Sequence, residues 1–178
     1  MSELYLVRHA QASFGAANYD QLSGLGHQQS RWLGEHLGNR GINFDTLVVG
    51  DMNRHHQTLD GICVGMGVDG SDRLVLPGLN EYNFTEMTEA YGLTYGDDPL
   101  YQQIAADPSD RKNYYRLLRK VLTVWTRDEI PNVPESWVDF KTRVNDSQQR
   151  IQAMADSGKS ILAIGSGGSI STFLGLVL

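Results

Sequence analysis

The sequence predicts an α/β fold in which helices cover both faces of a mostly parallel sheet, that is, a three-layer α/β/α sandwich. Short apolar runs of strand length alternate with stretches whose apolar residues recur at helical spacing. The runs at residues 4–7, 46–50 and 160–164 are each followed by polar residues or glycines. Connections between parallel strands are right-handed and place helices against the sheet, which favours covered faces.

The expected order of elements begins with a strand at residues 4–7 and a loop at residues 10–22. Ser23 then has the position of a helix N-cap, and the helix should end near Gly38. Apolar residues recur along this helix near helical spacing and are expected to form its core face. They are Leu25, Trp32, Leu33 and Leu37.

A second strand at residues 46–50 precedes a second helix, which is expected to run to about Gly65. A short third strand is predicted at residues 74–76, and an irregular loop opens at Leu79. The fourth strand is predicted at residues 160–164. The chain therefore alternates strand and helix over most of its length.

Residues 99–158 are expected to be mainly helical, with two apolar stripes that we interpret as core faces. The same stripes, if exposed, would permit a homodimer. We expect one domain over residues 1–178, with a helical insertion at about 97–157. The stretch at residues 171–178 is apolar and has no polar tail, so we also expect a truncated C-terminus that lacks a last helix turn or edge strand.

Composition restricts the class of ligand and the location. A chain of 178 residues fits one core, and its net charge of −6 gives no general attraction to nucleic acid or acidic membranes. Any anionic ligand must therefore be held by a local group of cations. The single cysteine, Cys63, excludes an internal disulfide and is expected to be buried. With no leader or membrane span in the sequence, we expect a cytoplasmic protein without a membrane partner.

Polar residues follow three of the predicted strands and are expected to converge, because ligands bind beyond the carboxyl ends of parallel strands. Arg8 and Arg54 would supply planar guanidinium groups suited to a phosphate, and His9 a nucleophile. The glycine turn at residues 165–168 would add backbone N–H donors and a helix dipole. In a purely structural alternative, Arg54 pairs with Asp51 or Asp60.

These residues resemble the histidine phosphatase superfamily, also called the phosphoglycerate mutase family, over nearly the whole chain. Residues 6–10 are similar to its Arg-His-Gly signature and residues 22–29 to its Leu-Thr-x-x-Gly-x-x-Gln helix start. Residues 54–58 resemble its Arg-Ala-x-Gln-Thr segment, residues 79–81 its acid loop, and residues 135–144 its Glu-Ser-x-x-x-Phe-x-x-Arg-Val helix.

The resemblance implies a phosphoglycerate-mutase-like fold and a phosphatase that transfers a phosphoryl group to His9, with Glu81 protonating the leaving oxygen. Arg8, Arg54, Ser166 and Gly167 would bind the phosphate of a small phosphorylated substrate or inorganic phosphate. No metal and no cofactor is implied. Imidazole is a competent nucleophile near neutral pH, and a carboxyl group can act first as an acid and then as a base.

The sequence departs from this family pattern at several positions. Ala10 stands in place of glycine, and Gly15 lies where mutases carry an asparagine, so a mutase is the less favoured activity. The larger departure is at residues 165–168, Gly-Ser-Gly-Gly, where the family pattern is Ser-His-Gly-Gly. Ser166 donates one hydrogen bond but carries no positive charge. Loss of one preorganised donor costs about 10²- to 10³-fold in rate, which predicts a slower enzyme.

Several alternatives follow from this serine. Restoring the histidine, Ser166→His, is expected to raise turnover, whereas a second histidine supplied by His55 or His56 is disfavoured because both lie on a helix and are expected to face water. A serine-hydrolase role for Ser166 is disfavoured, since Ile164 breaks the Gly-x-Ser-x-Gly pattern. The alternative to a phosphatase is a catalytically weak phosphate-binding or scaffolding member of the family.

Overall fold

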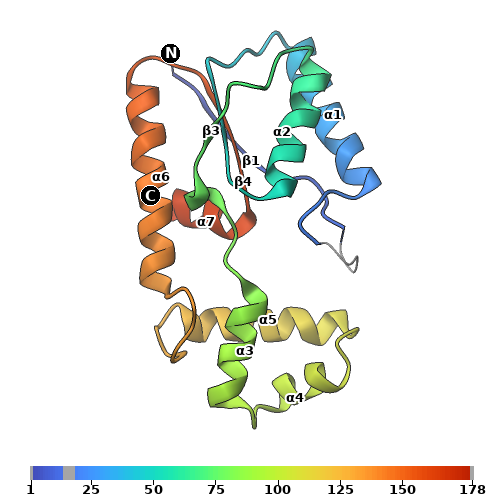
Figure 1. The fold of residues 1–178 in the computed structure, drawn as a ribbon, viewed down its shortest axis with the longest axis vertical. Coiled ribbons are helices and arrows are strands. Elements are labelled where there is room, and N and C mark those ends of the chain that lie inside the picture. The colour runs from blue at the N-terminus through green and yellow to red at the C-terminus, as the bar shows by residue number, and fades with distance from the viewer. Residues whose placement is uncertain (1, 14–18, 177–178) are drawn as a thin grey trace. The chain divides into compact units, whose positions relative to one another are not determined.

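Figure 1 shows a computed structural model of the chain, which describes residues 2–13 and 19–176. Gly15 and the last two residues of the apolar C-terminal stretch lie outside the described residues. The described chain forms two compact units. One combines the residues up to Glu81 with those from Arg143 onward, and the other is Tyr82–Thr142. The predicted site residues all belong to the first unit.

The described strands form one parallel sheet in the order β1-β4-β2-β3. Their bounds are Leu4–Arg8 for β1, Thr46–Val49 for β2, Leu74–Val75 for β3 and Ile161–Gly165 for β4. The sequence predicted each strand to within a residue or two. Strand β4 lies between β1 and β2, and all of its residues are buried. Central strands of parallel sheets are covered on both faces, which explains why β4 is apolar throughout.

Helices cover both faces of this sheet, so the prediction of three layers is confirmed. Figure 1 shows α1 (Gly24–Asn39) and α2 (Asn53–Met66) on one side. On the other side lie α7 (Gly167–Gly175) and the part of α6 (Trp137–Asp156) that belongs to this unit. The core under α1 and α2 consists of Leu37, Leu47, Val49, Leu59, Ile62, Cys63, Leu162 and Ile164.

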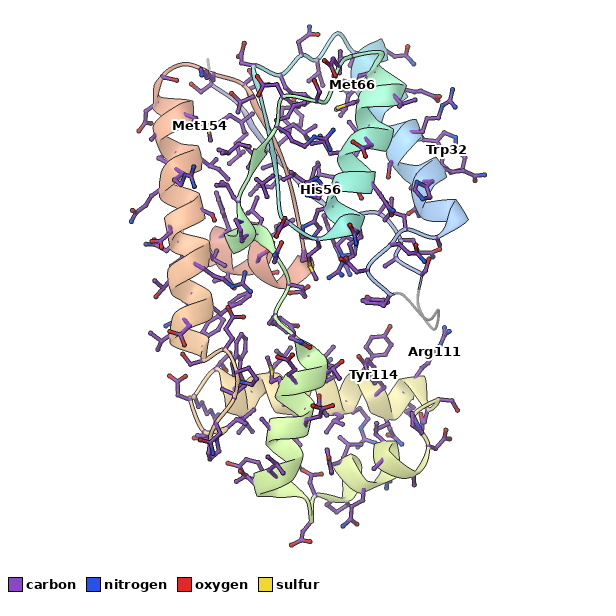
Figure 2. All side chains as sticks on the ribbon, in the orientation of Figure 1. Trp32, His56, Met66, Arg111, Tyr114 and Met154 are labelled. Carbon is purple, nitrogen blue, oxygen red and sulfur yellow. The ribbon has the colours of Figure 1, made fainter. Side chains whose placement is uncertain are left out.

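Helix α1 begins where the sequence predicted, because the Ser23 hydroxyl accepts a hydrogen bond from the Gly26 amide at 3.0 Å. Its buried face is only part of the predicted apolar stripe, since Leu37 is buried and Leu33 packs against the core. Leu25 and Trp32 are 44% and 56% exposed, and Figure 2 shows Trp32 pointing outward from the helix. The buried residues are instead the small ones at four-residue spacing, with Leu37: Gly26, Ser30, Gly34 and Leu37.

Small residues are required on this face because α1 and α2 pack in close contact. A Cβ atom built at Gly34 would collide with the backbone carbonyl of Ile62 on α2. Close helix contact of this kind depends on the absence of a side chain, which a hydrophobic pattern does not register. The prediction of the buried face was therefore right for Leu33 and Leu37 and wrong for Leu25 and Trp32, and it missed the small residues for a steric reason.

The second unit is helical and contains α3 (Phe84–Tyr95), α4 (Pro99–Ala106), α5 (Arg111–Trp125) and the first turns of α6. The sequence predicted helices from residue 99 onward but not α3, which Asn83 caps by accepting from the Glu86 amide. Trp125 is fully buried against Phe140. Over the described part of the chain, no helix combines the length and the apolar character that a membrane span needs.

Candidate active site

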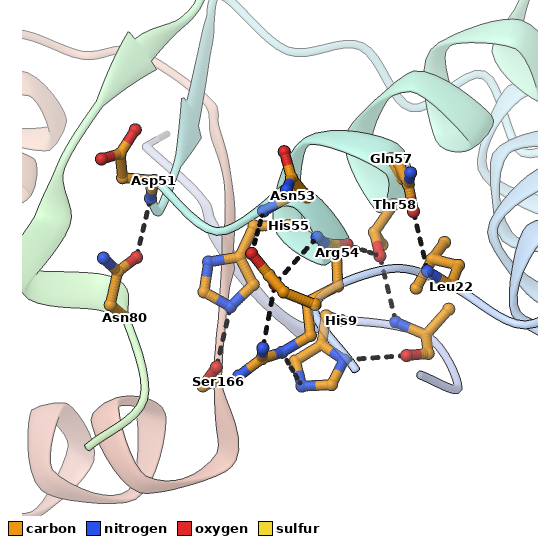
Figure 3. Close-up of polar contacts among 12 residues, drawn as sticks. His9, Leu22, Asp51, Asn53, Arg54, His55, Gln57, Thr58, Asn80 and Ser166 are labelled. Carbon is orange, nitrogen blue, oxygen red and sulfur yellow. Dashed lines mark hydrogen bonds and ion pairs between the residues drawn. The ribbon is translucent and has the colours of Figure 1, made fainter. Parts of the chain in front are cut away.

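The carboxyl ends of the strands bring the predicted site residues to one edge of the sheet. Arg8 at the end of β1 pairs with Gly165 at the end of β4. The His9 amide continues this pairing by donating to the Gly165 carbonyl at 2.9 Å, and the Gly50 amide donates to Ile164 at 3.0 Å. The predicted convergence of three loops is therefore present in the structure, and Figure 3 shows the polar contacts that result.

His9 is half-buried and has both ring nitrogens engaged. Nδ1 lies 2.8 Å from the Ala10 carbonyl, which can only accept, so Nδ1 carries the proton in the neutral ring. Nε2 then presents its lone pair and accepts from Arg54 Nε at 3.2 Å. Burial lowers the pKa of His9, and the charges of Arg54 and Arg8 lower it further against the opposing effect of the Ala10 carbonyl. The ring is thus held neutral, with the Nε2 lone pair directed at Arg54.

Arg54 is the buried cation of the site. It lies in the first turn of α2 and is only 4% exposed, and its Nη1 forms an ion pair with Asp20 at 2.9 Å. The same carboxylate accepts from the backbone amides of Asn53 and Arg54 at 3.0 and 3.4 Å, so it also caps the helix. Asp20 was not predicted from the sequence, because a single acidic residue in a long loop has no recognisable pattern.

Arg54 pairs with Asp20 and not with the residues that the sequence offered, which have other contacts. Asp60 pairs with Arg73 at 2.7 Å, and the Asp51 amide donates to the Asn80 side chain at 2.7 Å. The alternative in which Arg54 pairs with Asp51 or Asp60 is therefore wrong, because its partner is Asp20. The guanidinium faces His9 rather than either of these residues.

Arg8 is exposed and lies against the glycine turn after β4. A Cβ atom built at Gly167 would stand 3.5 Å from Arg8 Nε, so the guanidinium stem runs along the backbone of this turn. Gly167 is the first residue of α7, whose N-terminus carries a partial positive charge. Two guanidinium groups and one helix N-terminus thus face the neighbourhood of His9.

Glu81 accepts from the Gly168 amide, which the sequence predicted to be a donor for a bound anion. Its two carboxylate oxygens lie 3.1 and 3.2 Å from the Gly168 amide. The Ser166 amide is also engaged, since it donates to the Leu79 carbonyl at 3.1 Å. The expectation that the whole turn supplies free amides is therefore corrected: in the structure the Gly168 amide binds the predicted acid instead.

Arg143 fixes the loop that carries Glu81. Its guanidinium donates to the carbonyls of four residues within this loop at 3.0 to 3.3 Å, namely Pro77, Gly78, Asn80 and Glu81. A carbonyl cluster of this kind needs a cation with several donors in one plane, which arginine supplies. The arginine in the 135–144 motif is thus a support for the acid loop rather than a ligand for phosphate.

The segment after Arg54 holds the loop that follows β1. Thr58 Oγ1 accepts from the Ala10 amide at 3.1 Å, and Gln57 Oε1 accepts from the Leu22 amide at 2.7 Å. The Thr58 hydroxyl donates to the Arg54 carbonyl at 2.7 Å. This explains why a Gln-Thr pair follows the arginine: it ties both ends of the loop to α2.

The structure contradicts the expectation that His55 faces water. His55 is fully buried, and its Nε2 lies 2.7 Å from Oγ of Ser166, which is itself fully buried (Figure 3). His56 is only half-buried. The signal was present in the sequence, since residues 55, 59 and 62 follow helical spacing and the last two are core residues.

No group of three or more His, Cys, Asp or Glu side chains is arranged to hold a metal ion in the part of the chain that the structure describes. The groups that remain are a neutral imidazole, two guanidinium groups, a hydroxyl, a helix N-terminus and a carboxylate. A nucleophile beside several anion donors is the arrangement that phosphoryl transfer requires.

Comparisons with known proteins agree with this geometry. Residues 4–178 match the model of the histidine phosphatase superfamily (branch 1). No curated protein sequence matches the chain. Among solved structures, the fold is similar to a phosphoglycerate mutase from Bacillus anthracis, with a TM-score of 0.66 and 20% identity over 98% of this chain and 79% of that one.

Two further structures with the same fold are phosphatases. A mycobacterial glucosyl-3-phosphoglycerate phosphatase, solved with VO3, has a TM-score of 0.61 and 22% identity over 100% of this chain and 82% of that chain. The protein histidine phosphatase SixA, solved with tungstate, has a TM-score of 0.55 and 16% identity over 96% and 73%. At these identities the likeness concerns the fold.

Proposed function

Because the chain belongs to the histidine phosphatase superfamily (branch 1), we propose that it is a phosphatase that hydrolyses a small phosphomonoester through a phosphohistidine on His9. The observation that carries the proposal is the state of the His9 ring. Its Nδ1 is bound to the Ala10 carbonyl, and its Nε2 lone pair points at the guanidinium of Arg54. A phosphoryl group bound to that guanidinium is placed beside the nucleophile.

In the first step, the bond between His9 Nε2 and phosphorus forms while the bond from phosphorus to the leaving oxygen breaks. The leaving oxygen takes the proton of the Glu81 carboxyl group and departs as an alcohol. In the second step, a water molecule attacks the phosphohistidine and gives its proton to Glu81. The nitrogen–phosphorus bond breaks, inorganic phosphate leaves, and His9 and Glu81 return to their starting states.

Positive groups stabilise the charge on the transferring phosphoryl oxygens. Arg54 gives up its hydrogen bond to His9 Nε2 and turns its donors to these oxygens, while Asp20 keeps the guanidinium in place. Arg8 and the Gly167 amide, which lie together at the turn, bind the same oxygens, and Ser166 adds its hydroxyl.

The position of Glu81 beside the phosphate turn supports a role in proton transfer. Arg143 fixes its loop, and the Gly168 amide holds its carboxylate at the N-terminus of α7, next to the turn that binds phosphate. An amide donor and a helix N-terminus stabilise the ionised carboxylate, which is the form that accepts the water proton in the second step.

A second candidate function is phosphate binding without turnover. The specific observation that favours it is the replacement of a histidine by Ser166 at the phosphate turn, which removes one positive charge from the site. The two candidates differ in turnover, because only the enzyme releases more than one equivalent of product per protein molecule.

The test is steady-state hydrolysis of a generic aryl phosphate without added metal, by the unaltered protein and by His9→Ala. We expect multiple turnovers that vanish in His9→Ala. A control variant, His27→Ala, changes an exposed histidine of α1 and should leave the rate unchanged. Equal rates in the unaltered protein and in His9→Ala contradict the phosphatase. Phosphate-dependent thermal stabilisation with no turnover favours the binding protein.

A further inference from the structure

The buried contact between His55 and Ser166 joins two segments that are far apart in the sequence. His55 lies in the first turn of α2, and Ser166 is the N-cap of α7. Their polar atoms, Nε2 and Oγ, are 2.7 Å apart, and both residues are fully buried. His55 also lies beside the proposed nucleophile, since its ring centroid is 5.6 Å from that of His9.

The contacts of His55 determine its protonation state. Burial lowers its pKa to about 3, with further lowering by the charges of His9, Arg54 and His56, so the ring is neutral at physiological pH. Nδ1 is buried and has no hydrogen-bond partner among the residues that the structure describes. An unpaired buried acceptor is more common in proteins than an unpaired buried N–H group. The proton therefore belongs on Nε2, and the Nε2–H group donates to Ser166 Oγ.

This hydrogen bond determines whether the Ser166 hydroxyl acts as a donor or an acceptor toward a ligand. A hydroxyl that accepts from His55 keeps its own proton for another acceptor. The Arg8 guanidinium beside this turn and the Gly167 amide can only donate, so the acceptor that suits the hydroxyl is an anion bound next to them.

We propose that His55 is a positioning residue for phosphoryl transfer: its Nε2–H group orients the Ser166 hydroxyl so that this hydroxyl donates to a phosphoryl oxygen. The inference rests on the proposed function. The phosphate turn has a serine where the family pattern has a histidine, and the imidazole of His55 on α2 acts there instead. This imidazole acts through Ser166 and does not touch the phosphoryl group.

Two features of the sequence agree with this role. The partners of the contact are both departures from the family pattern, with histidine at 55 in place of alanine and serine at 166 in place of histidine. The space for the imidazole depends on Gly50, because a Cβ atom built there would collide with His55 Nδ1 and stand 2.8 Å from Asn80 Oδ1. The absence of a side chain at Gly50 thus leaves room for the His55 ring that contacts Ser166.

The contact also changes the expectation for Ser166→His. A second imidazole at position 166 would enter space that the His55 ring already occupies, since the two side chains touch and both are fully buried. We therefore expect Ser166→His alone to lower turnover. The double variant His55→Ala with Ser166→His, which empties the space first, should be faster than either single variant.

The first experiment compares His55→Gln, which can still donate to Ser166, with His55→Leu, which cannot. With an aryl phosphate as the probe, His55→Leu should lower kcat by about 10- to 100-fold with little change in KM, and His55→Gln should recover part of this loss. The matched control is His56→Ala, the neighbouring half-buried histidine, which should retain the unaltered rate. Equal kcat in the unaltered protein and in folded His55→Leu overturns the proposal.

A second experiment tests whether the two residues act together. Ser166→Ala should cost about as much as His55→Leu, and the double variant should be no slower than the slower single one, because partners that act as a unit are not additive. Losses that multiply in the double variant would show that the two side chains act separately, and would overturn the proposal.

Two readouts need no turnover and separate failure of this inference from failure of the proposed function. In long-range proton–nitrogen NMR spectra near pH 7, His55 should be the Nε2–H tautomer; a proton on Nδ1 overturns the inference. If His9→Ala shows that the protein is no phosphatase, orthovanadate binding replaces kinetics. The Tm increase caused by orthovanadate should be smaller in His55→Leu than in the unaltered protein, and equal increases overturn the positioning role.

Discussion

The guanidinium of Arg54 connects Asp20 to His9: Nη1 lies 2.9 Å from Asp20 Oδ1, and Nε donates to His9 Nε2 at 3.2 Å. The carboxylate therefore determines which edge of the guanidinium faces the nucleophile. Because Arg54 is almost fully buried, few other orientations are open to it. The first prediction follows from this geometry.

Asp20→Asn should lower kcat/KM for an aryl phosphate by between about 10- and 100-fold, because a small displacement of a positioning group from the reacting atoms has an effect of this size. The amide oxygen can still accept from the α2 amides, so the fold should persist. Asp60→Asn, which removes the partner of Arg73 elsewhere on α2, is the matched control and should retain full activity. An unchanged kcat/KM in Asp20→Asn would show that Arg54 does not depend on this carboxylate.

The pH dependence of the rate reports the protonation of His9. The ring must be neutral to attack, and its pKa lies below the ordinary value of 6.5, because burial and the nearby arginines disfavour the imidazolium. On acidification, the fall of kcat/KM should therefore be centred below pH 6.5. An NMR titration of the His9 ring should give the same pKa. A limb centred above pH 6.5 in both measurements contradicts the proposed environment of His9.

The pH dependence of stability reports His55. Its pKa falls from 6.5 in the unfolded chain to about 3 in the fold, so below pH 6.5 the unfolded state binds a proton that the native state does not. The free energy of unfolding therefore decreases as pH falls, by about 2 kcal/mol at pH 5 from this residue. Urea unfolding at pH 7 and pH 5 should show a decrease that is smaller by about this amount in His55→Gln. Identical decreases would mean that His55 is protonated as easily in the fold as in the unfolded chain.

Arg143→Met should destabilise the chain by about 1 to 3 kcal/mol, because the carbonyls of residues 77–81 lose a charged donor. It should also lower kcat, since the acid loop is no longer fixed. Arg150→Met, an exposed position on the same helix, should stay within about 0.5 kcal/mol of the unaltered protein. Equal urea midpoints for the two variants would contradict the supporting role of Arg143.

The sheet and the convergence of its loops could be predicted from the sequence, because both depend on local patterns. Apolar runs give the strands, and the shared edge of a parallel sheet gives the meeting of Arg8, His9, Arg54 and the 165–168 turn. The buried face of α1 could not be predicted in the same way, since close packing against α2 selects small residues such as Gly34.

The partners of the site residues were also beyond local patterns. Asp20 reaches Arg54 from a loop 34 positions away, and Glu81 reaches the Gly168 amide from 87 positions away. His55 was missed for a different reason, because its neighbours in sequence are polar and its helical spacing with Leu59 was not used. A polar side chain at helical spacing from core residues lies on the buried face of its helix, as His55 does.

The central claim is a covalent bond between phosphorus and His9, and the most direct measurement is the mass of the intact protein after rapid mixing with an aryl phosphate. Denaturation in base preserves phosphohistidine, and denaturation in acid releases it. The account predicts the gain of one phosphoryl group that survives base, is lost in acid and is absent in His9→Ala. A gain that persists in His9→Ala, or turnover through His9 without any base-stable, acid-labile phosphoryl group, would contradict it.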